Sequence, residues 1–184
     1  MAEAYPTPLA GQRLTASLLR SMQPQTLRKT ADTQITASTT PVADPHLTFT
    51  VEAGAVYTWW GWIKYDGATA GDVLLSFTAP SGALGEWMGH GTGITVIGAA
   101  STPTLETDTV RTNGYMQRTE SNDVTQSRSF GALGVGNALT VDIKGTLRVG
   151  STAGTWALAW AQNASSATAT TLYTDSYITL LRTA

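Results

Sequence analysis

Residues 139–149 read Leu-Thr-Val-Asp-Ile-Lys-Gly-Thr-Leu-Arg-Val, and residues 156–160 read Trp-Ala-Leu-Ala-Trp. Apolar side chains stand at every second position of both stretches, which is the period of a strand with one buried face. A Gly- and Ser-containing turn at 150–154 separates them at hairpin distance, and a loop at 162–166 precedes a last strand that reaches Leu181. The pattern predicts an antiparallel meander, and nothing in it resembles an active site.

The same alternation continues toward the N-terminus. Leu47, Phe49 and Val51 share one face of a strand, and residues 73–77 form another strand with an inward apolar face. Residues 43–45, Ala-Asp-Pro, are typical of a turn. We therefore predict an all-β chain: a single antiparallel β-sandwich, jelly-roll-like and of about eight strands, over residues 27–184, preceded by an N-terminal arm over residues 1–26.

Composition excludes several classes of function. Charged residues make up 13% of the chain, about half of the roughly 25% usual for soluble domains. The net charge of −2 argues against a nucleic-acid partner, which would require a basic face. No cysteine is present, so there is neither a disulfide framework nor a Cys-ligated zinc site. We expect no signal peptide at the N-terminus and no membrane span in the chain.

The N-terminal arm carries a short helix signal. Thr15 is a good N-cap, Leu14 and Leu19 stand at the positions of a hydrophobic staple, and Pro24 ends the helix. Two isolated helical turns are unstable in water, so the arm must dock on its own domain, on a sister subunit or on a larger assembly. The residues expected to take part in this anchoring are Tyr5, Pro6, Pro8, Leu14, Leu18, Leu19 and Met22.

Six tryptophans need separate interpretation. Trp156 and Trp160 share the parity of Leu158, so they are expected in the core. Trp59 should join Tyr57, Ile63 and Tyr65 on one face of another strand. Trp60 and Trp62 then point away from this core, which predicts burial in a subunit interface or beneath the arm. The tryptophan at position 87 stands in a Gly-rich segment and is the best candidate for an exposed contact.

Candidate chemistry is sparse. His46 and His90 are the only histidines, and their spacing fits no metal motif, so we expect no metal site and no cofactor. Residues 89–93, Gly-His-Gly-Thr-Gly, lack the lysine of a phosphate loop and are interpreted as flexible turn glycines. The carboxylate pairs Asp66/Asp72 and Glu106/Asp108 are interpreted as surface turn residues. No catalytic residue is predicted, and the chain is not expected to be an enzyme.

Several segments resemble a known family. Residues 28–32 (Arg-Lys-Thr-Ala-Asp), the Thr-rich strand to Thr40, residues 43–47 and Tyr57 resemble a pattern in small virion proteins of tailed phages infecting actinobacteria. Residues 160–170 and 176–180 look like the end of the same module, and residues 8–19 resemble the segment that precedes it. The resemblance covers most of the chain except about 83–137. It implies a structural, often trimeric, jelly-roll-like virion protein with no catalytic residues, assembled in the host cytoplasm.

Two functions remain open besides a small hydrolase with an unrecognised site. One is a homotrimeric capsid decoration or head-fibre protein attached to major capsid or other virion proteins through its arm. The alternative is a tail-associated receptor-binding protein that recognises a host cell-wall glycan. The short segment before the sandwich favours the first. If a host surface is contacted, the recognition residues should lie between Gly85 and Asn137, where loops carry recognition: Trp87, His90, Tyr115 and Arg118.

Overall fold

The alternating segments form antiparallel strands in the computed structural model, which describes residues 10–11, 13–93, 114–118 and 123–184. These described residues contain one short helix and twelve strands. The elements are α1 (Ala16–Ser21), β1 (Gln25–Arg28), β2 (Thr33–Ile35), β3 (Val42–Val51), β4 (Val56–Asp66), β5 (Val73–Thr78), β6 (Trp87–Thr92), β7 (Gly114–Arg118), β8 (Arg128–Phe130), β9 (Leu139–Arg148), β10 (Gly154–Gln162), β11 (Thr170–Leu172) and β12 (Tyr177–Arg182).

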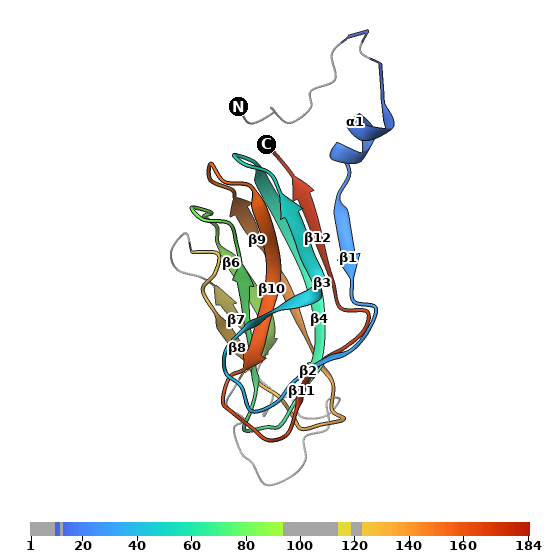
Figure 1. Ribbon diagram of the computed structural model, residues 1–184. Coiled ribbons are helices and arrows are strands. Elements are labelled where there is room, and N and C mark those ends of the chain that lie inside the picture. Colours follow the sequence, from blue (N-terminus) through green and yellow to red (C-terminus); the bar gives the residue numbers. More distant parts are fainter. Residues whose placement is uncertain (1–9, 12, 94–113, 119–122) are drawn as a thin grey trace.

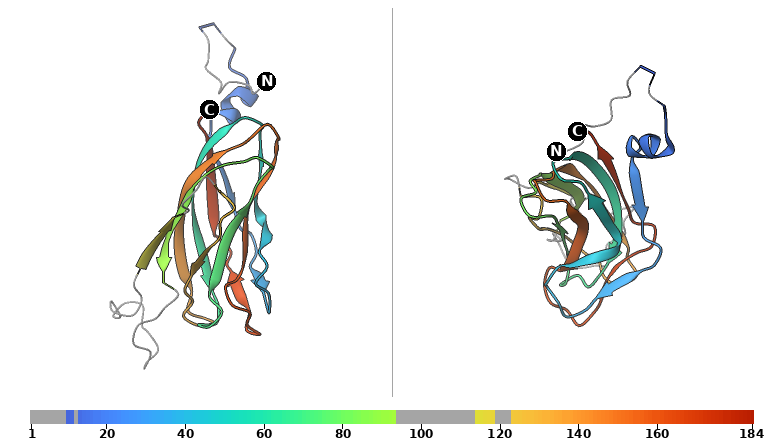
Figure 2. Two further views of the ribbon diagram at one scale, coloured as in Figure 1. Left: turned by 90° about the vertical axis from the view of Figure 1, so that its left-hand side faces the viewer. Right: turned by 45° about the horizontal axis from the view of Figure 1, so that its top comes forward.

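Strands β3 to β10 have the connectivity of a jelly roll. They pair as a nested hairpin, β3 with β10, β4 with β9, β5 with β8 and β6 with β7, and every pair is antiparallel. Further pairing of β10 with β5 and of β9 with β6 divides the hairpin into the sheets β3-β10-β5-β8 and β4-β9-β6-β7. These sheets form the two layers seen in Figures 1 and 2. The predicted all-β sandwich is confirmed, with its eight central strands in jelly-roll order.

Four further strands widen one sheet. β12 pairs with the free edge of β4, and β1 pairs with β12, so β1 becomes the outermost strand on that side. β11 joins the far end of β4 and carries β2 on its other side. The segment that follows the arm is thereby part of the sheet, and β1 begins at Gln25, two residues before the predicted start of the sandwich at residue 27.

Aromatic rings fill the space between the two sheets. The rings of Phe77 and Trp156 stack at 4.9 Å with an interplanar angle of 7°, and Trp59 lies 5.0 Å from Trp156. Phe49 and Trp87 contact the same group from either side. Such aromatic pairs stabilise a core beyond the area they bury. The predicted core positions of Trp156 and Trp160 are confirmed, since both are buried. Trp59 is buried on the same face of β4 as Tyr57, Ile63 and Tyr65, as predicted.

The Gly-rich segment around residue 89 is a strand, and its interpretation as a flexible turn was wrong. Gly89 and Gly91 lie in β6, beside β9 and opposite β7. A Cβ at Gly89 would overlap the ring of Phe130, and one at Gly91 would lie 2.9 Å from Val141. Glycine is used here because the β6 backbone approaches side chains of the core closely, a role glycine also has in strands.

The turn predicted at residues 43–45 was also wrong, because these residues lie within β3. The pairing with β10 shifts there: Ala157 is opposite Thr48, whereas Ala159 is opposite Ala43. Residues 44–47 therefore form a bulge in β3, which bends the strand and turns side chains out of the normal alternation. The bulge explains why a turn-like sequence occurs in a strand, and it places Asp44 inside the protein.

We expect the aromatic core to dominate stability. Phe77→Ala should lower the free energy of unfolding by about 3–5 kcal/mol, because it leaves a cavity among Trp59, Trp87 and Trp156. Val135→Ala, at a side chain that is 60% exposed, should change it by less than about 0.5 kcal/mol. Urea denaturation measures both, and equal losses in the two variants would contradict this description of the core.

Candidate functional site

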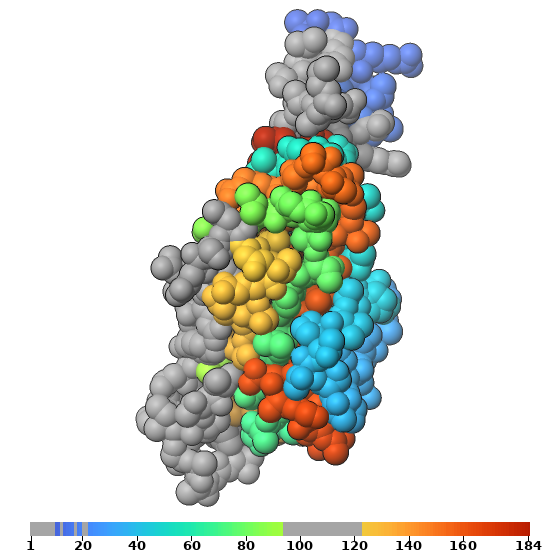
Figure 3. Space-filling model, turned by 60° about the vertical axis from the view of Figure 1, so that its left-hand side comes forward, coloured from blue at the N-terminus to red at the C-terminus, as the bar shows by residue number. Residues whose placement is uncertain are grey.

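The arm presents apolar surface beyond one end of the sandwich. Thr15 caps α1, since its Oγ1 accepts a hydrogen bond from the backbone N of Leu18 at 3.2 Å. Leu14 and Leu19, the expected staple pair, are 59% and 47% exposed. The described residues of the arm, blue in Figures 1 and 3, project past the ends of the strands. Of the other predicted anchor residues, Leu18 and Met22 are half-buried, and Tyr5, Pro6 and Pro8 lie outside the described residues.

The arm is joined to the sandwich by strand pairing. The residues of β1 lie opposite residues 177–180 of β12, and the hydroxyls of Thr26 and Thr179 are 2.8 Å apart. Arg28 forms an exposed ion pair with Asp175. The backbone N of Lys29 donates to the carbonyl of Ser176 at 2.8 Å, which extends the pairing by one residue.

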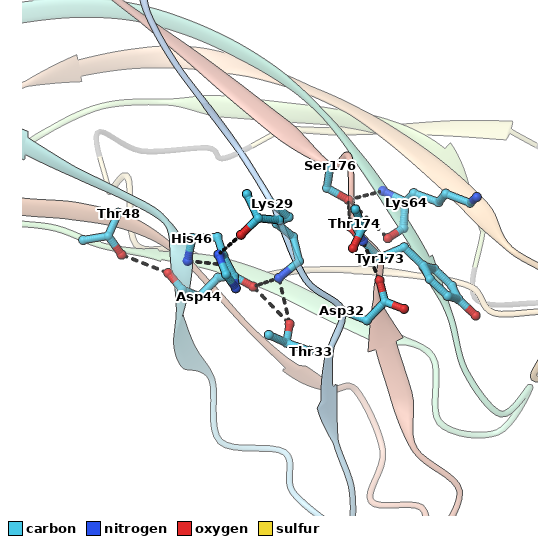
Figure 4. Close-up of polar contacts among 11 residues, drawn as sticks. Lys29, Asp32, Thr33, Asp44, His46, Thr48, Lys64, Tyr173, Thr174 and Ser176 are labelled. Carbon is cyan, nitrogen blue, oxygen red and sulfur yellow. Dashed lines mark hydrogen bonds and ion pairs between the residues drawn. The ribbon is translucent and has the colours of Figure 1, made fainter.

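A buried ion pair completes this junction. Lys29 and Asp44 are both completely buried, and the Lys29 ammonium donates to the Asp44 carboxylate. Thr33 Oγ1 lies 2.8 Å from Lys29 Nζ and 3.2 Å from Asp44 Oδ2, so it contacts both charges. The backbone N of His46 donates to Asp44 Oδ1 at 2.9 Å. Figure 4 shows these groups converging between the chain after β1 and the bulge of β3. We call Lys29, Thr33 and Asp44 the clasp.

Neighbouring polar contacts in Figure 4 are structural. Asp32 accepts a hydrogen bond from the backbone N of Thr174 at 2.7 Å, and this bond lowers the pKa of the Asp32 carboxyl. Ser176 Oγ accepts from the backbone N of Lys64 at 2.9 Å. His46 is half-buried, and its Nδ1 lies 3.1 Å from Thr30 Oγ1. These contacts hold the turn before β12 against the chain that leaves β1.

Asp66 and Asp72 do not lie on the surface, which corrects their interpretation as surface turn residues. Both are buried, and each accepts a hydrogen bond from a backbone amide of the loop before β9: Gly136 N donates to Asp66 at 2.7 Å, and Ala132 N donates to Asp72 at 2.9 Å. Asp66 also accepts from the Tyr173 hydroxyl at 2.7 Å, which raises the pKa of Tyr173 to about 12. Burial raises the pKa of Asp72. Glu106 and Asp108 lie outside the described residues.

A hollow of about 470 Å³ lies on the outer face of the larger sheet, which we call the outer-face hollow. Four strands contribute to it, because Trp60 on β4 lies opposite Lys144 on β9, and Asp142 on β9 lies opposite His90 on β6. Tyr177 comes from β12, where it lies opposite Trp62, two residues along β4 from Trp60. The lining residues whose side chains are described are Trp60, Gly61, Met88, His90, Asp142, Ile143, Lys144 and Tyr177.

The structure separates the predicted recognition residues. Trp87 is not exposed: it is 2% exposed, its ring contacts Phe77, and its Nε1 donates to the carbonyl of Gln126 at 3.0 Å. His90 is exposed, but on a strand rather than in a loop. Tyr115 and Arg118 belong to β7, and their side chains are outside the description. Of the two members of this set whose side chains are described, His90 lies at the outer-face hollow and Trp87 does not.

Trp60 and Trp62 point to the outer face, as their parity predicts. Trp60 is 42% exposed and Trp62 is half-buried within the single chain. Sequence reasoning missed Tyr177, Asp142 and Lys144 as their neighbours. Their alternation placed each on an outward face, but only the register of β12, β4, β9 and β6 brings them together.

The described residues supply little else on which chemistry could be built. No group of three or more His, Asp and Glu side chains in the described ranges could hold a metal ion. In the same ranges, no helix has the length and apolarity needed to span a bilayer. Besides the arm with its clasp and the outer-face hollow, a hollow of about 410 Å³ lies where the arm joins β1, and Pro24, Gln25 and Leu180 contribute to its lining.

Comparisons with known proteins give no family. No family model matches the chain, and a search of curated proteins finds no match. Among solved structures, a VP2 subviral particle of infectious bursal disease virus shares 13% identity at a TM-score of 0.19 and covers 88% of this chain and 41% of that chain. The Gx strain of the same virus shares 10% identity at a TM-score of 0.20, with 86% of this chain and 40% of that chain covered. The Gt strain shares 13% identity at a TM-score of 0.19, with 88% of this chain and 41% of that chain covered. This chain thus spans about two fifths of those proteins. The jelly-roll assignment rests on the pairing of the strands alone and not on this likeness.

The clasp should behave as a coupled pair. Lys29→Met should lower the free energy of unfolding by about 3–5 kcal/mol, because it leaves the Asp44 carboxylate buried without its partner. The double variant Lys29→Met, Asp44→Asn should lose less than the sum of the two single variants. Arg28→Met, which breaks the adjacent exposed pair, should cost less than about 1 kcal/mol. Strict additivity in urea denaturation would contradict the coupling.

The two aspartates should have opposite effects on pH dependence. Because folding raises the pKa of Asp72, the wild type loses stability from this group as pH rises from the unfolded pKa through the folded pKa. Asp72→Asn should therefore gain stability relative to wild type between about pH 3 and about pH 7. Asp32→Asn should lose stability relative to wild type at lower pH, as pH rises from about 2 to about 5, because folding lowers that pKa and the wild type gains stability only until pH passes the unfolded pKa. Parallel pH profiles for both variants and the wild type would refute this assignment.

Proposed function

We propose that this chain is a non-catalytic structural protein of a viral particle, of the type carried by tailed phages infecting actinobacteria. In this proposal it assembles as a homotrimer, decorates the capsid surface, and is held there by its N-terminal arm bound to another virion protein. The host cytoplasm is its place of assembly. The sequence resemblance in residues 28–47 and 160–180 supports this origin, and the jelly roll is an architecture that viral capsid proteins use.

The observation that carries the proposal is the arm. Leu19, on a six-residue helix, and Leu14, two residues before that helix begins, expose apolar surface on an arm that projects past the sandwich. A helix of this length is unstable in water without a packing partner. An apolar helix face kept at the end of a charge-poor domain is therefore suited to insertion between other protein subunits.

The clasp gives this attachment a firm base. A pull on the arm is transmitted through β1 to the edge of β12 and through Lys29 to the bulge of β3, which belong to different sheets. Breaking a buried ion pair costs far more than breaking an exposed one. The domain would thus stay attached for as long as the arm stays bound, which is the property that a decoration protein requires.

Deletion of residues 2–24 tests the proposal. Because β1 begins at Gln25, the shortened chain keeps every described strand and should fold with unchanged unfolding in urea. It should no longer be incorporated into particles, whereas the full chain is. Western blots of particles purified from cells expressing each form would measure incorporation.

A point variant separates arm length from arm chemistry. Leu14→Ser, Leu19→Ser keeps the arm but removes its exposed apolar surface, and it should reduce incorporation as strongly as the deletion does. Val135→Ala, which removes an equally exposed apolar side chain elsewhere, should be incorporated normally. Normal incorporation of the deleted form would overturn attachment through the arm. A monomer mass in light scattering of the full chain would overturn the trimer.

A further inference from the structure

The outer-face hollow combines two kinds of surface. Trp60 and Tyr177 supply aromatic rings on neighbouring strands, and because Tyr177 lies opposite Trp62, two residues along β4 from Trp60, they are diagonal neighbours on the same face. Asp142, Lys144 and His90 supply a carboxylate, an ammonium group and an imidazole on the two strands beyond. The hollow therefore has an aromatic side toward β12 and a polar side toward β6.

The polar side chains are free to meet a ligand. Within the described ranges, none of Asp142, Lys144 and His90 forms a hydrogen bond or an ion pair through its side chain, and all three are exposed. By contrast, three carboxylates elsewhere in the described residues, those of Asp44, Asp66 and Asp72, are buried and accept hydrogen bonds from backbone amides. Within the described ranges, the charged groups at the hollow therefore take part in no contact that holds the fold together.

We propose that the outer-face hollow binds a sugar ring of an extended glycan. The face of an aromatic ring carries partial negative charge and attracts the C–H groups on the flat side of a sugar, a role open to Trp60 and Tyr177. Sugar hydroxyls both donate and accept hydrogen bonds, which suits a carboxylate acceptor and an ammonium donor side by side. The volume of about 470 Å³ lies in the range of roughly 300–1,000 Å³ for small-ligand sites.

The same chemistry argues against a second copy of this chain as occupant. The buried centre of an interface between identical subunits is depleted of Lys and Asp, whose desolvation is costly. Here Lys144 and Asp142 stand in the hollow itself, directly beside Trp60 and Trp62 in the sheet. The interface expected at Trp60 and Trp62 is therefore replaced in this proposal by a ligand site. The inference goes beyond the structural role proposed above and does not depend on the arm.

Sugar binding by the full chain tests the inference. Saturation-transfer NMR should detect binding of at least one member of a panel of chitotriose, cellotriose, maltotriose and galactotriose at millimolar concentration. Trp60→Ala should weaken that binding about tenfold or more, the equivalent of 1.4 kcal/mol. Asp142→Asn should weaken it as well, because an exposed acceptor loses its charge. Val135→Ala, outside the hollow, should bind as the wild type does.

Three results would overturn the inference. The first is a wild-type chain that binds no member of the panel. The second is sugar binding that Trp60→Ala and Asp142→Asn leave unchanged, which would place the sugar elsewhere. The third is an oligomer that dissociates in Trp60→Ala, by light scattering, without any sugar binding, which would make this face an interface between copies. If Trp60→Ala does not fold, Asp142→Asn alone decides, because Asp142 is exposed and has no described partner. Each of these results leaves the arm experiment unaffected.

Discussion

Burial of the Lys29 ammonium group beside Asp44 fixes how the arm, the strand that follows it and the smaller sheet are joined. A charge removed from water costs several kcal/mol unless an opposite charge and hydrogen bonds replace the solvent. Asp44 can reach Lys29 only because β3 bulges at residues 44–47 and departs from its pairing with β10. The bulge, the position of β1 on β12 and the direction of the arm are thus linked, since moving any one of them would leave a buried charge without its partner.

The sandwich itself follows from simpler rules. Alternation in residues 47–51, 73–77 and 139–149 predicts inward faces that the structure confirms, and the aromatic rings between the sheets come from these strands and from Trp59 and Trp156. Two expectations failed for tertiary reasons. Gly89 and Gly91 stand in a segment that resembles a turn, but they allow β6 to pack closely against Phe130 and Val141. Trp87 begins the same strand and is therefore buried in the core instead of exposed in a loop. Residues 43–45 have a sequence typical of a turn, but they lie within β3 where its bulge begins.

The clasp and the hollow were beyond sequence reasoning for a related reason. Lys29 and Asp44 lie in the two segments, 28–32 and 43–47, that carry the family resemblance, yet nothing in either segment indicates burial. The parity of Trp60 correctly predicted its outward direction. Its neighbours Tyr177, Asp142 and His90 come from strands far apart in the chain, and only the register of the pairing between strands joins them. Periodicity predicts the face on which a residue lies, whereas register decides which residues meet.

We propose that this jelly roll is part of a particle surface, where it is attached by an apolar arm and bears a ligand site on the outer face of its larger sheet. The arm projects past one end of the sandwich, whereas the hollow lies on the outer face of the larger sheet. Quantitative mass spectrometry of purified particles tests the claim most directly, with the major shell protein as the internal reference. The account predicts that this chain is present in numbers comparable to those of the shell protein. Its absence from the particles, or only a few copies in each, would contradict a role on the capsid surface.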